Sequence, residues 1–317
     1  MWPPHFYRKK DCWISDRRKG GGVRRKMWRM FQENAGKNTF LAAGKERQDM
    51  SVVEYRQVRM AYGEKVIIDN FNLSIEKGEF VTIIGSSGCG KTTILKMVNG
   101  LVQPVGGEVL VEGRNTREVD LAMLRRNIGY AIQGSVLFPH MTVEKNIAYV
   151  PNLLNRKDKK RTAQAVAKWM GIVGLDDSLR SRYPSELSGG QQQRVGIARA
   201  LAASPDILLM DEPFGAVDEI TRGSLQDEIA RIHRETGITI LFVTHDIGEA
   251  LKLGTKVLVM DQGEIQQYAP PEEILHHPAT AFVSRLAEKE RRRCHLPDER
   301  LEECEYSGAG SGPRQNG

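Results

Sequence analysis

Residues 85–93 restrict the possible folds of this chain more than any other stretch of its sequence. They read Gly-Ser-Ser-Gly-Cys-Gly-Lys-Thr-Thr, with the apolar run Phe80–Ile84 before them and a helical pattern from Lys91 onward. The spacing fits G-x4-G-K-[ST], in which glycines let the backbone curl until successive N–H groups point at phosphate oxygens. The N-terminus of the following helix adds the positive end of its dipole. The stretch therefore predicts a phosphate-binding loop between a buried strand and a helix, rather than a glycine-rich turn without a ligand.

The side chains of this loop have expected roles of their own. Lys91 would place a point charge at the outer phosphates of a nucleotide, and the Thr92 hydroxyl suits Mg²⁺. Cys89 has two interpretations: a reactive thiol whose pKa is lowered by the helix N-terminus and the nearby lysine, or a small buried residue that fills space. The reactive thiol would be attacked by a maleimide and protected by bound nucleotide. Nucleotide contacts are expected from the whole loop, Gly85, Ser86, Ser87, Gly88, Cys89, Gly90, Lys91, Thr92 and Thr93.

A second motif, Ile207–Glu212, is an apolar strand that ends in two carboxylates. Since α/β sheets bind ligands at the carboxyl ends of their strands, both side chains are expected near the phosphate loop. Asp211 fits a ligand of Mg²⁺, and Glu212 fits the general base that polarises an attacking water. Taken alone, an apolar strand that ends in two carboxylates is more often an ordinary strand end without a catalytic role. Beside a phosphate loop it predicts a site that hydrolyses a phosphate bond.

The rest of the pattern predicts an α/β fold with a largely parallel core sheet, because apolar strands alternate with helical stretches. Residues 157–171 have the spacing of an amphipathic helix, and the stretch from about 134 to 200 is expected to be an inserted, mostly helical subdomain. The stretch before the phosphate loop is expected to form a small antiparallel β subdomain. Strands are predicted at Val52–Tyr62, Lys65–Ile68, Leu73–Ile75, Ile207–Met210 and Thr239–Val243.

The two ends of the chain differ from its middle. Residues 1–49 hold 13 Lys and Arg against 5 Asp and Glu, a net charge of +8, whereas the remainder carries a net charge of −2. Because no period of 2 or 3.6 persists in residues 1–49, we expect a disordered basic extension and a working protein that begins at Met50. The alternative is a basic arm that binds anionic lipid. Residues 288–317 are expected to be a polar tail, which leaves 50–287 as the folded domain.

Composition narrows the setting in which the chain works. No stretch approaches the roughly 18 uncharged apolar residues that span a membrane, and the N-terminus lacks an apolar signal core. The four cysteines, Cys12, Cys89, Cys294 and Cys304, are scattered and include no CxxC pair. A reducing, cytoplasmic compartment is the simplest interpretation. The near-neutral body also argues against a surface for nucleic acid, so no nucleic-acid partner is expected.

A third motif, Leu187-Ser-Gly-Gly-Gln191, lies between the phosphate loop and the Asp-Glu strand. It resembles the signature of ATP-binding cassette (ABC) ATPases, and the resemblance extends from about Val52 to Leu286. Taken singly, Tyr62 would be an ordinary turn aromatic and His245 an ordinary histidine at a strand end. The ordered set is what indicates the family. The further matches are Tyr62 for an aromatic residue that stacks on adenine, Gln133 in IGYAIQ, Gly215–Asp218 with Val217 where Leu is usual, and His245 in FVTHD.

The resemblance implies a P-loop NTPase (RecA-like) core and two copies that face each other head to tail. Each ATP would lie between the phosphate loop of one copy and the signature of the other. Water would attack in line, with the charge on the transferred group stabilised by the site. The residues implied across the dimer are Ser188, Gly189, Gly190, Gln191 and Asp218. The implied catalytic residues are Glu212, His245, Lys91 and Gln133, and the implied Mg²⁺ ligands are Thr92, Gln133 and Asp211.

Four segments resemble more closely the ATPases of importers for osmoprotectants such as glycine betaine, carnitine and choline. They are residues 137–154, 182–203, 210–228 and 242–254. This resemblance implies membrane-spanning permease subunits as partners, a substrate-binding protein as an indirect partner, and a peripheral location at the cytoplasmic face of the membrane. Two alternatives stay open: an importer for polar amino acids or other small solutes, and a soluble ABC protein that acts on ribosomes or DNA. The single signature motif and the lack of a long heptad run favour the transporter.

Residues around Gln133–Pro139 have two interpretations. Leu137 and Phe138 are apolar where a surface loop is normally polar. They form either part of a groove for a helix of the membrane subunit or a contact that packs under the helical insert.

Overall fold

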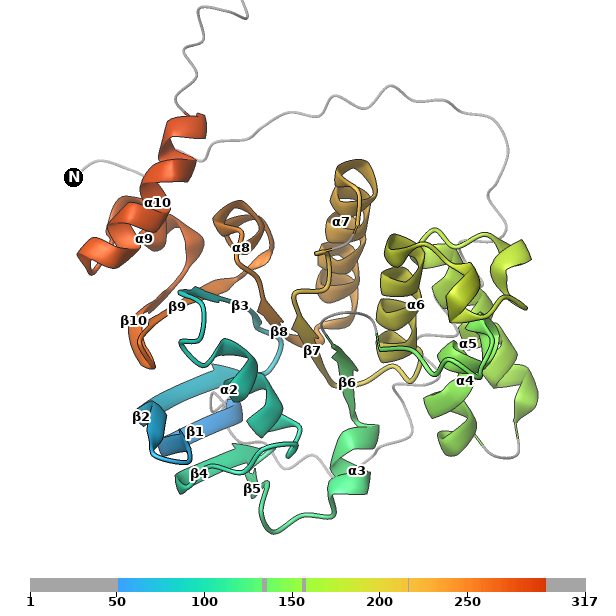
Figure 1. Cartoon of the computed structure of the whole chain (residues 1–317), viewed down its shortest axis with the longest axis horizontal. Helices are drawn as coiled ribbons and strands as arrows, with labels where there is room; N and C mark the ends of the chain where they lie inside the picture. Colours follow the sequence, from blue (N-terminus) through green and yellow to red (C-terminus); the bar gives the residue numbers. More distant parts are fainter. Residues whose placement is uncertain (1–50, 133–135, 156–157, 216, 295–317) are drawn as a thin grey trace, which may run out of the picture. The chain divides into compact units, whose positions relative to one another are not determined.

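The computed structural model describes residues 51–132, 136–155, 158–215 and 217–294 (Figure 1). The basic stretch 1–49, Gln133, Ala216 and most of the tail lie outside these ranges, so the expectations for them stay predictions. In the described part of the chain, no helix combines the length and the apolar content that a bilayer crossing requires.

The smaller of two sheets is antiparallel, with the strand order β2-β1-β4-β5. Its strands are β1 (Ser51–Tyr62), β2 (Lys65–Glu76), β4 (Gly106–Val111) and β5 (Arg114–Asn115). The sequence predicted two strands where β2 is continuous, and this prediction was wrong. The polar residues between the two apolar runs do not end the strand, because its pairing with β1 shifts register and Asn70 adopts φ +48°. Asn tolerates this left-handed region better than most residues, so the irregularity stays inside the strand.

The larger sheet has the strand order β10-β9-β3-β8-β7-β6. Neighbouring strands from β9 to β6 are parallel, and β10 pairs antiparallel with β9 at one edge. Phe80–Ile84 are buried without alternation, as expected for a strand covered on both faces. The strands are β3 (Phe80–Gly85), β6 (Ile128–Ala131), β7 (Ile207–Asp211), β8 (Thr239–Val243), β9 (Lys256–Asp261) and β10 (Glu264–Ala269).

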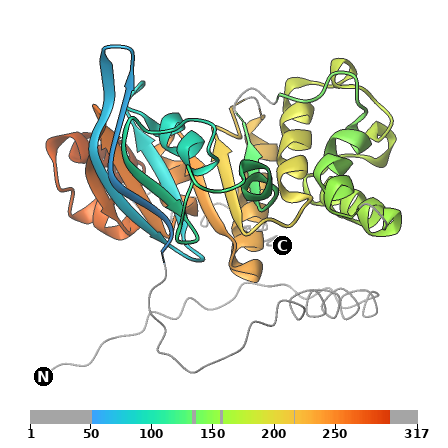
Figure 2. The same ribbon diagram turned by 90° about the horizontal axis from the view of Figure 1, so that it is seen from below.

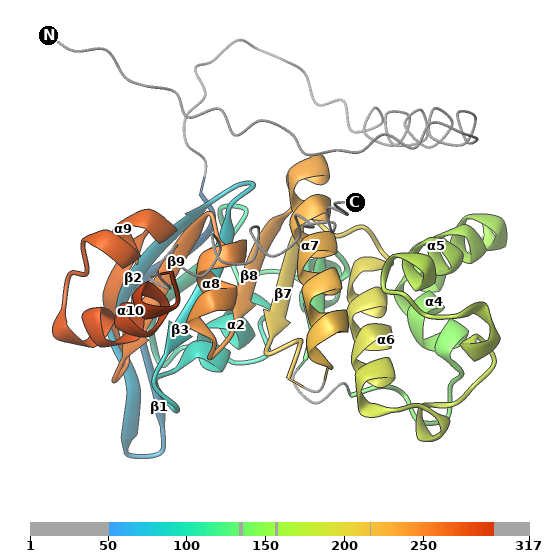
Figure 3. The same cartoon turned by 90° about the horizontal axis from the view of Figure 1, so that it is seen from above.

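Helices cover both faces of this sheet, and alternate strand residues supply the two cores. Ile207 and Leu209 pack in a core with α2 (Lys91–Val98), whereas Leu208 and Met210 pack in another with α7 (Glu219–Thr236). Figure 3 shows α7 and α8 (Ile247–Leu253) over one face, and Figure 2, from the opposite side, shows α2 in teal. The remaining helices outside the insert are α3 (Leu121–Arg126), α9 (Pro271–His276) and α10 (Ala281–Cys294), the last of which continues past residue 287.

The helical insert lies between β6 and β7 in the sequence. It consists of α4 (Val143–Leu154), α5 (Lys159–Ile172), α6 (Gly189–Leu201) and two short 3₁₀ turns, Asp177–Leu179 and Pro184–Glu186. The amphipathic pattern places Val166 and Met170 in the core that α6 shares with β7. Leu137 is only 8% exposed and joins the same core, so this residue packs under the insert. The predicted α/β fold, with an antiparallel β part and a helical insert, is confirmed.

Candidate active site

The phosphate loop follows β3, and glycine is required at its two ends. Gly85 has φ +155°, and a Cβ built on it would lie 1.9 Å from the carbonyl oxygen of Met260 on β9. Gly90 has φ +103° and caps α2, and a Cβ there would come within 2.9 Å of the Ile68 side chain. No side chain fits either position without moving its neighbours. The turn that exposes backbone N–H groups at the start of α2 therefore depends on the core sheet on one side and on the antiparallel sheet on the other.

Two polar side chains hold the loop in this shape. The Lys91 ammonium donates to the carbonyl oxygens of Gly85 at 2.9 Å and Ser86 at 2.7 Å, so it lies across the loop that carries it. The Ser86 hydroxyl donates to the carboxylate of Asp261, at the end of β9, at 2.5 Å. Neutral carbonyls leave the charge of Lys91 unneutralised, which keeps it available to a phosphate. Asp261 was missed by the sequence analysis, because only the sheet order shows that β9 ends beside β3.

Cys89 is 3% exposed and belongs to the hydrophobic core beneath the loop. Its sulfur lies 3.9 Å from the Lys91 ammonium nitrogen. The structure thus favours the interpretation of a small buried residue over that of a reactive thiol. Its expected contribution to nucleotide binding would come from the backbone.

We expect a maleimide to modify Cys89 in the folded chain at least ~10-fold more slowly than in the unfolded chain, because reaction requires local opening of the loop. Peptide mass spectrometry after timed labelling, with and without denaturant, measures both rates at this residue. Equal rates in the two states would show that the thiol is accessible after all.

Asp211 and Thr92 meet at the carboxyl end of the sheet. The Thr92 hydroxyl donates to Asp211 at 3.0 Å, and Asp211 is almost fully buried. Burial raises the pKa of Asp211 above its usual value, while the hydrogen bond from Thr92 and the charges of Lys96 and Lys91 oppose this rise. A buried carboxylate of this kind is stabilised by a cation. Thr92 and Asp211, the two predicted Mg²⁺ ligands that the structure describes, are therefore in contact.

Tyr130, on β6, is a further polar group that the sequence analysis did not single out. Its hydroxyl is buried and has no hydrogen-bond partner within the described part of the chain. Burial, and secondarily the charge of Asp211, raise the pKa of this phenol. Buried hydroxyl groups are normally paired, so this one is an exception, and it lies on the strand next to β7, which carries Asp211. No motif could have indicated it, since the pairing of β6 with β7 determines its neighbours.

Glu212 and His245 face each other from the ends of β7 and β8. The distance from His245 Nδ1 to Glu212 Oε1 is 3.7 Å, and the side chains are 72% and 28% exposed respectively. Glu212 adopts φ +46°, which is uncommon for a residue with a side chain and is often found at functional sites. Its N–H donates to the Val243 carbonyl at 3.0 Å, and its carbonyl accepts from Gln193 Nε2 at 3.3 Å. The backbone that aims this carboxylate is thus fixed from both sides.

The signature residues begin helix α6, with Ser188 as its N-cap. The Ser188 hydroxyl accepts from the Gln191 N–H at 3.3 Å, and the Gln191 side chain accepts from the Ser188 N–H at 2.9 Å. This reciprocal pair is a capping box. Gly189 has no side chain to cover the helix start, where free N–H groups and the dipole favour an anion. The hydroxyl hydrogen of Ser188 also remains available to donate.

The predicted site residues do not form one hydrogen-bonded group within the described part of the chain. None of their hydrogen bonds joins Ser188–Gln191 to the phosphate loop. Asp218 is exposed and caps α7 by accepting from the Thr221 N–H at 2.9 Å, a bond that lowers the pKa of Asp218. Tyr62, 51% exposed, ends β1. The phosphate loop, Asp211, Glu212 and His245 therefore form one group of polar residues, and the start of α6 forms another that no hydrogen bond of the described residues joins to it.

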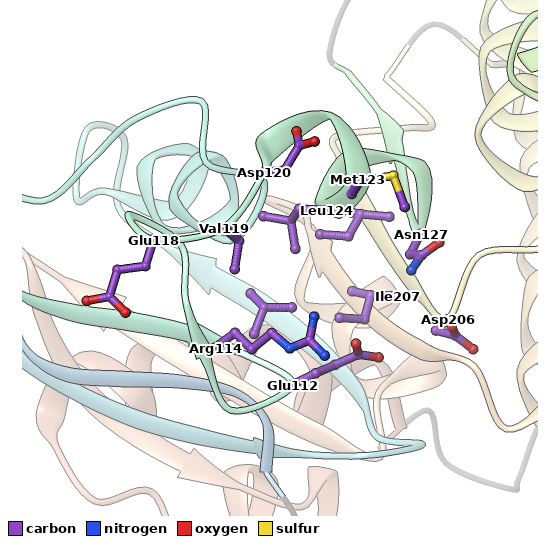
Figure 4. Close-up of a pocket in the computed structure, with 12 residues that line it drawn as sticks. Glu112, Arg114, Glu118, Val119, Asp120, Met123, Leu124, Asn127, Asp206 and Ile207 are labelled. Atoms are coloured by element: carbon purple, nitrogen blue, oxygen red, sulfur yellow. The ribbon is translucent and has the colours of Figure 1, made fainter. Parts of the chain in front are cut away.

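A cavity of about 490 Å³ lies elsewhere (Figure 4). Its wall includes Ile128 and Ile207, the first residues of β6 and β7, together with Met123 and Leu124 of α3 and several charged side chains. It is therefore at the amino ends of these strands, opposite the carboxylates. Ligands of open α/β sheets bind at the carboxyl ends, so this cavity is not the candidate active site.

Comparison with known proteins agrees with these features. Residues 68–215 match the family model of the ABC transporter. The chain is 48% identical over 254 residues to the glycine betaine/carnitine/choline transport ATP-binding protein OpuCA of Bacillus subtilis, covering 80% of this chain and 67% of that protein. It is also 48% identical over 232 residues to the glycine betaine uptake system ATP-binding protein YehX of Escherichia coli, covering 73% of this chain and 75% of that protein.

A solved structure gives the same answer for the fold. The ATP-binding cassette MJ0796, described as dimeric and bound to ADP and Pi, matches with a TM-score of 0.66 and 33% sequence identity. The match covers 69% of this chain and 98% of that one. Several curated relatives are longer, and this chain spans 60% of the choline transport ATP-binding protein OpuBA of Bacillus subtilis. The resemblance indicated by the motifs is confirmed: the chain belongs to the ATP-binding cassettes of the ABC transporter family.

Proposed function

We propose that this chain is the ATP-hydrolysing subunit of an importer for osmoprotectants of the glycine betaine, carnitine and choline class. The observation that carries the hydrolytic part is the arrangement of Glu212 and His245 beside the pair Thr92–Asp211. The substrate class rests on the relatives. Those named for osmoprotectants are 46–50% identical, whereas those named for sulfate/thiosulfate and for spermidine/putrescine import are 45% and 39% identical.

In this proposal the phosphate loop binds the ATP phosphates through its N–H groups and through Lys91. Glu212 accepts a proton from the attacking water as general base, which its fixed backbone and partly exposed carboxylate permit. His245 donates a hydrogen bond to the transferred phosphoryl group, where negative charge must be stabilised. Gln133 and Tyr62 keep the roles that the family resemblance implies, Gln133 as a catalytic residue and Mg²⁺ ligand and Tyr62 as a contact of the adenine.

The residues present also fit Mg²⁺. In the described part of the chain no three His, Cys, Asp or Glu side chains gather in a group that could hold a metal. Mg²⁺ with ATP does not need such a group, because it takes one or two protein oxygens, phosphate oxygens and waters. The Asp211 carboxylate and Thr92 hydroxyl would supply the protein oxygens. Bound there, Mg²⁺ would neutralise charge on the β- and γ-phosphates.

The second half of each site would come from a second copy of the chain. The exposed start of α6, with Ser188, Gly189 and Gly190, offers N–H groups to the γ-phosphate bound by the partner's phosphate loop. The dimeric state of the MJ0796 cassette supports this arrangement. Asp218, exposed at the start of α7, would lie at the same interface.

The permease would bind the helical insert. Phe138 is half-buried, and its ring centroid lies 4.8 Å from that of Tyr149 on α4. Tyr149 is exposed, and so are three apolar side chains near the pair in the sequence, as is common where a partner binds. They are Val136, Leu153 and Leu154. Such a contact would hold the ATPase peripherally at the cytoplasmic face of the membrane, while Leu137 beneath it only stabilises the insert.

Deleting the gene in its native host should reduce uptake of at least one labelled osmoprotectant (glycine betaine, carnitine or choline) to background at high osmolarity. The wild-type gene on a plasmid should restore uptake, and a Glu212→Gln copy should not, because import requires hydrolysis. Sulfate and putrescine uptake in the same strains is the control. Normal osmoprotectant uptake together with loss of one control substrate would reject the substrate class and leave the ATPase role standing.

A further inference from the structure

Three buried or half-buried side chains connect the loop of His245 to helix α7. The Thr244 hydroxyl donates to Glu249 Oε2 at 2.7 Å, and the Gln226 side-chain amide donates to Glu249 Oε1 at 3.0 Å. Thr244 and Gln226 are 3% and 7% exposed. Both oxygens of the Glu249 carboxylate are therefore occupied by donors from two different elements, the end of β8 and the middle of α7.

The same hydroxyl of Thr244 also fixes the turn on which His245 lies. It accepts from the Asp246 N–H at 3.0 Å, so it bridges the residues on either side of the histidine. The Thr244 N–H donates to the Ile83 carbonyl at 3.1 Å, which ties the turn to β3 just before the phosphate loop. The Thr244 hydroxyl has a single hydrogen, and this hydrogen points at Glu249. The bond to Glu249 therefore fixes the rotation of the hydroxyl, so that a lone pair faces the Asp246 N–H.

The series of hydrogen bonds ends in the middle of helix α7. Gln226 Oε1 accepts from the Lys252 ammonium at 3.1 Å, which fixes the orientation of the amide. Helix α7 begins at its cap Asp218, the residue expected at the interface between two copies. Figure 3 shows α7 and α8 side by side over the sheet. A shift of α7 would therefore be passed to the His245 turn through Gln226 and Glu249.

We propose that Glu249 is a positioning residue for ATP hydrolysis, which holds His245 in its catalytic place by joining Thr244 to Gln226. This inference rests on the proposed role of His245 as a group that touches the transferred phosphate. Glu249 itself touches neither substrate nor phosphate. Its loss therefore affects turnover while binding of ATP, which depends on the phosphate loop, is retained.

Glu249→Gln in the full-length chain tests the inference. A carboxamide has one acceptor and one donor where the site needs two acceptors, so either Thr244 or Gln226 loses its partner. We expect kcat for ATP to fall on the order of 10–100-fold, the effect of misplacing a catalytic group by about 1 Å, with KM unchanged. The double variant Gln226→Glu/Glu249→Gln restores the pattern. The glutamine at position 249 accepts from Thr244 and donates to the glutamate at position 226. That glutamate in turn accepts from Lys252. The double variant should recover most of the lost kcat.

A matched control uses the exposed neighbour of Gln226. Asp227→Asn removes the 2.8 Å ion pair with Lys252 but leaves the chain from Thr244 to Gln226 intact, so kcat should stay near wild type. His245→Ala alone should lower kcat on the order of 10²–10³-fold. If Glu249 acts through His245, adding Glu249→Gln to His245→Ala should cause no further loss, whereas a merely structural effect would add to it.

The outcomes separate this inference from the proposed function. An inactive wild-type chain, or an unimpaired His245→Ala variant, contradicts the proposed function. A normal His245 effect with an unimpaired Glu249→Gln variant overturns only the positioning role. Two further results would also overturn the positioning role: a fall in kcat that the double variant does not reverse, and a fall that adds fully to the effect of His245→Ala. General destabilisation would then explain the loss.

Discussion

Glu212→Gln is expected to lower the rate of ATP hydrolysis by ~10²–10⁴-fold, the usual contribution of a general base. The amide keeps the shape of the side chain but cannot accept a proton from water. The backbone of residue 212 is held by Val243 and Gln193, so the substitution should not disturb its geometry. ATP binding should persist, because the phosphate loop and Asp211 are unchanged. The variant should therefore accumulate as an ATP-bound dimer.

Steady-state phosphate release measures the rate, and gel filtration with and without ATP measures the dimer. Glu273→Gln, an exposed glutamate on α9, is the matched control and should behave as wild type. Turnover near the wild-type rate in Glu212→Gln would exclude the general-base role. A variant that neither hydrolyses nor binds ATP would instead indicate that the substitution damages the fold.

Gly85→Ala is expected to weaken ATP binding by roughly 10²-fold or more, since displacing a positioned group by about 1 Å already has an effect of that size. A Cβ at this position would lie 1.9 Å from the Met260 carbonyl oxygen, so either the loop or β9 must move. Backbone cannot give way as a flexible side chain does. The free energy of unfolding should also fall, by about 3 kcal/mol or more.

Gly113→Ala is the control for the backbone angle alone. Gly113 has φ +73°, and a Cβ there meets nothing within 4 Å. The cost should be limited to the left-handed backbone, about 1–2 kcal/mol, with ATP affinity unchanged. Isothermal calorimetry and denaturant unfolding give the two quantities for each variant. If both variants lose the same stability and bind ATP equally, the close approach of Gly85 to β9 has no role.

The core strands and the helical insert were predictable from the sequence because local pattern determines them. Thr239–Val243 is a strand with the predicted bounds, and its side chains are all buried. The polar stretch within β2 was misread because the irregular pairing that accommodates Asn70 depends on β1, which local pattern does not show. A bulge and a strand end have the same composition, and only the partner strand distinguishes them.

In the candidate site, too, the sequence predicted the residues that local motifs determine and missed those that depend on distant parts of the chain. Lys91 and Thr92 were found because a motif places them at the end of the phosphate loop, and Asp211 and Glu212 because a motif places them at a strand end; Thr92 does meet Asp211. Asp261, Tyr130 and Gln193 could not be found in this way. Asp261 contacts Ser86 over 175 positions of the sequence, Gln193 contacts the Glu212 carbonyl, and Tyr130 is placed by the pairing of β6 with β7. Their partners are set by the order of strands in the sheet and not by local spacing.

The capping box at the start of α6 has a consequence for how the signature should vary among related sequences. The side chain of Gln191, the last residue of the signature, accepts a hydrogen bond from the Ser188 N–H. This side chain therefore stabilises the start of its own helix. Glutamate is the other side chain that completes a capping box at this position. Substitution to Glu should thus be tolerated, whereas Ala or Leu would leave the helix start without that bond. A search pattern that ends in Gln or Glu therefore describes the physical requirement better than one that ends in Gln alone.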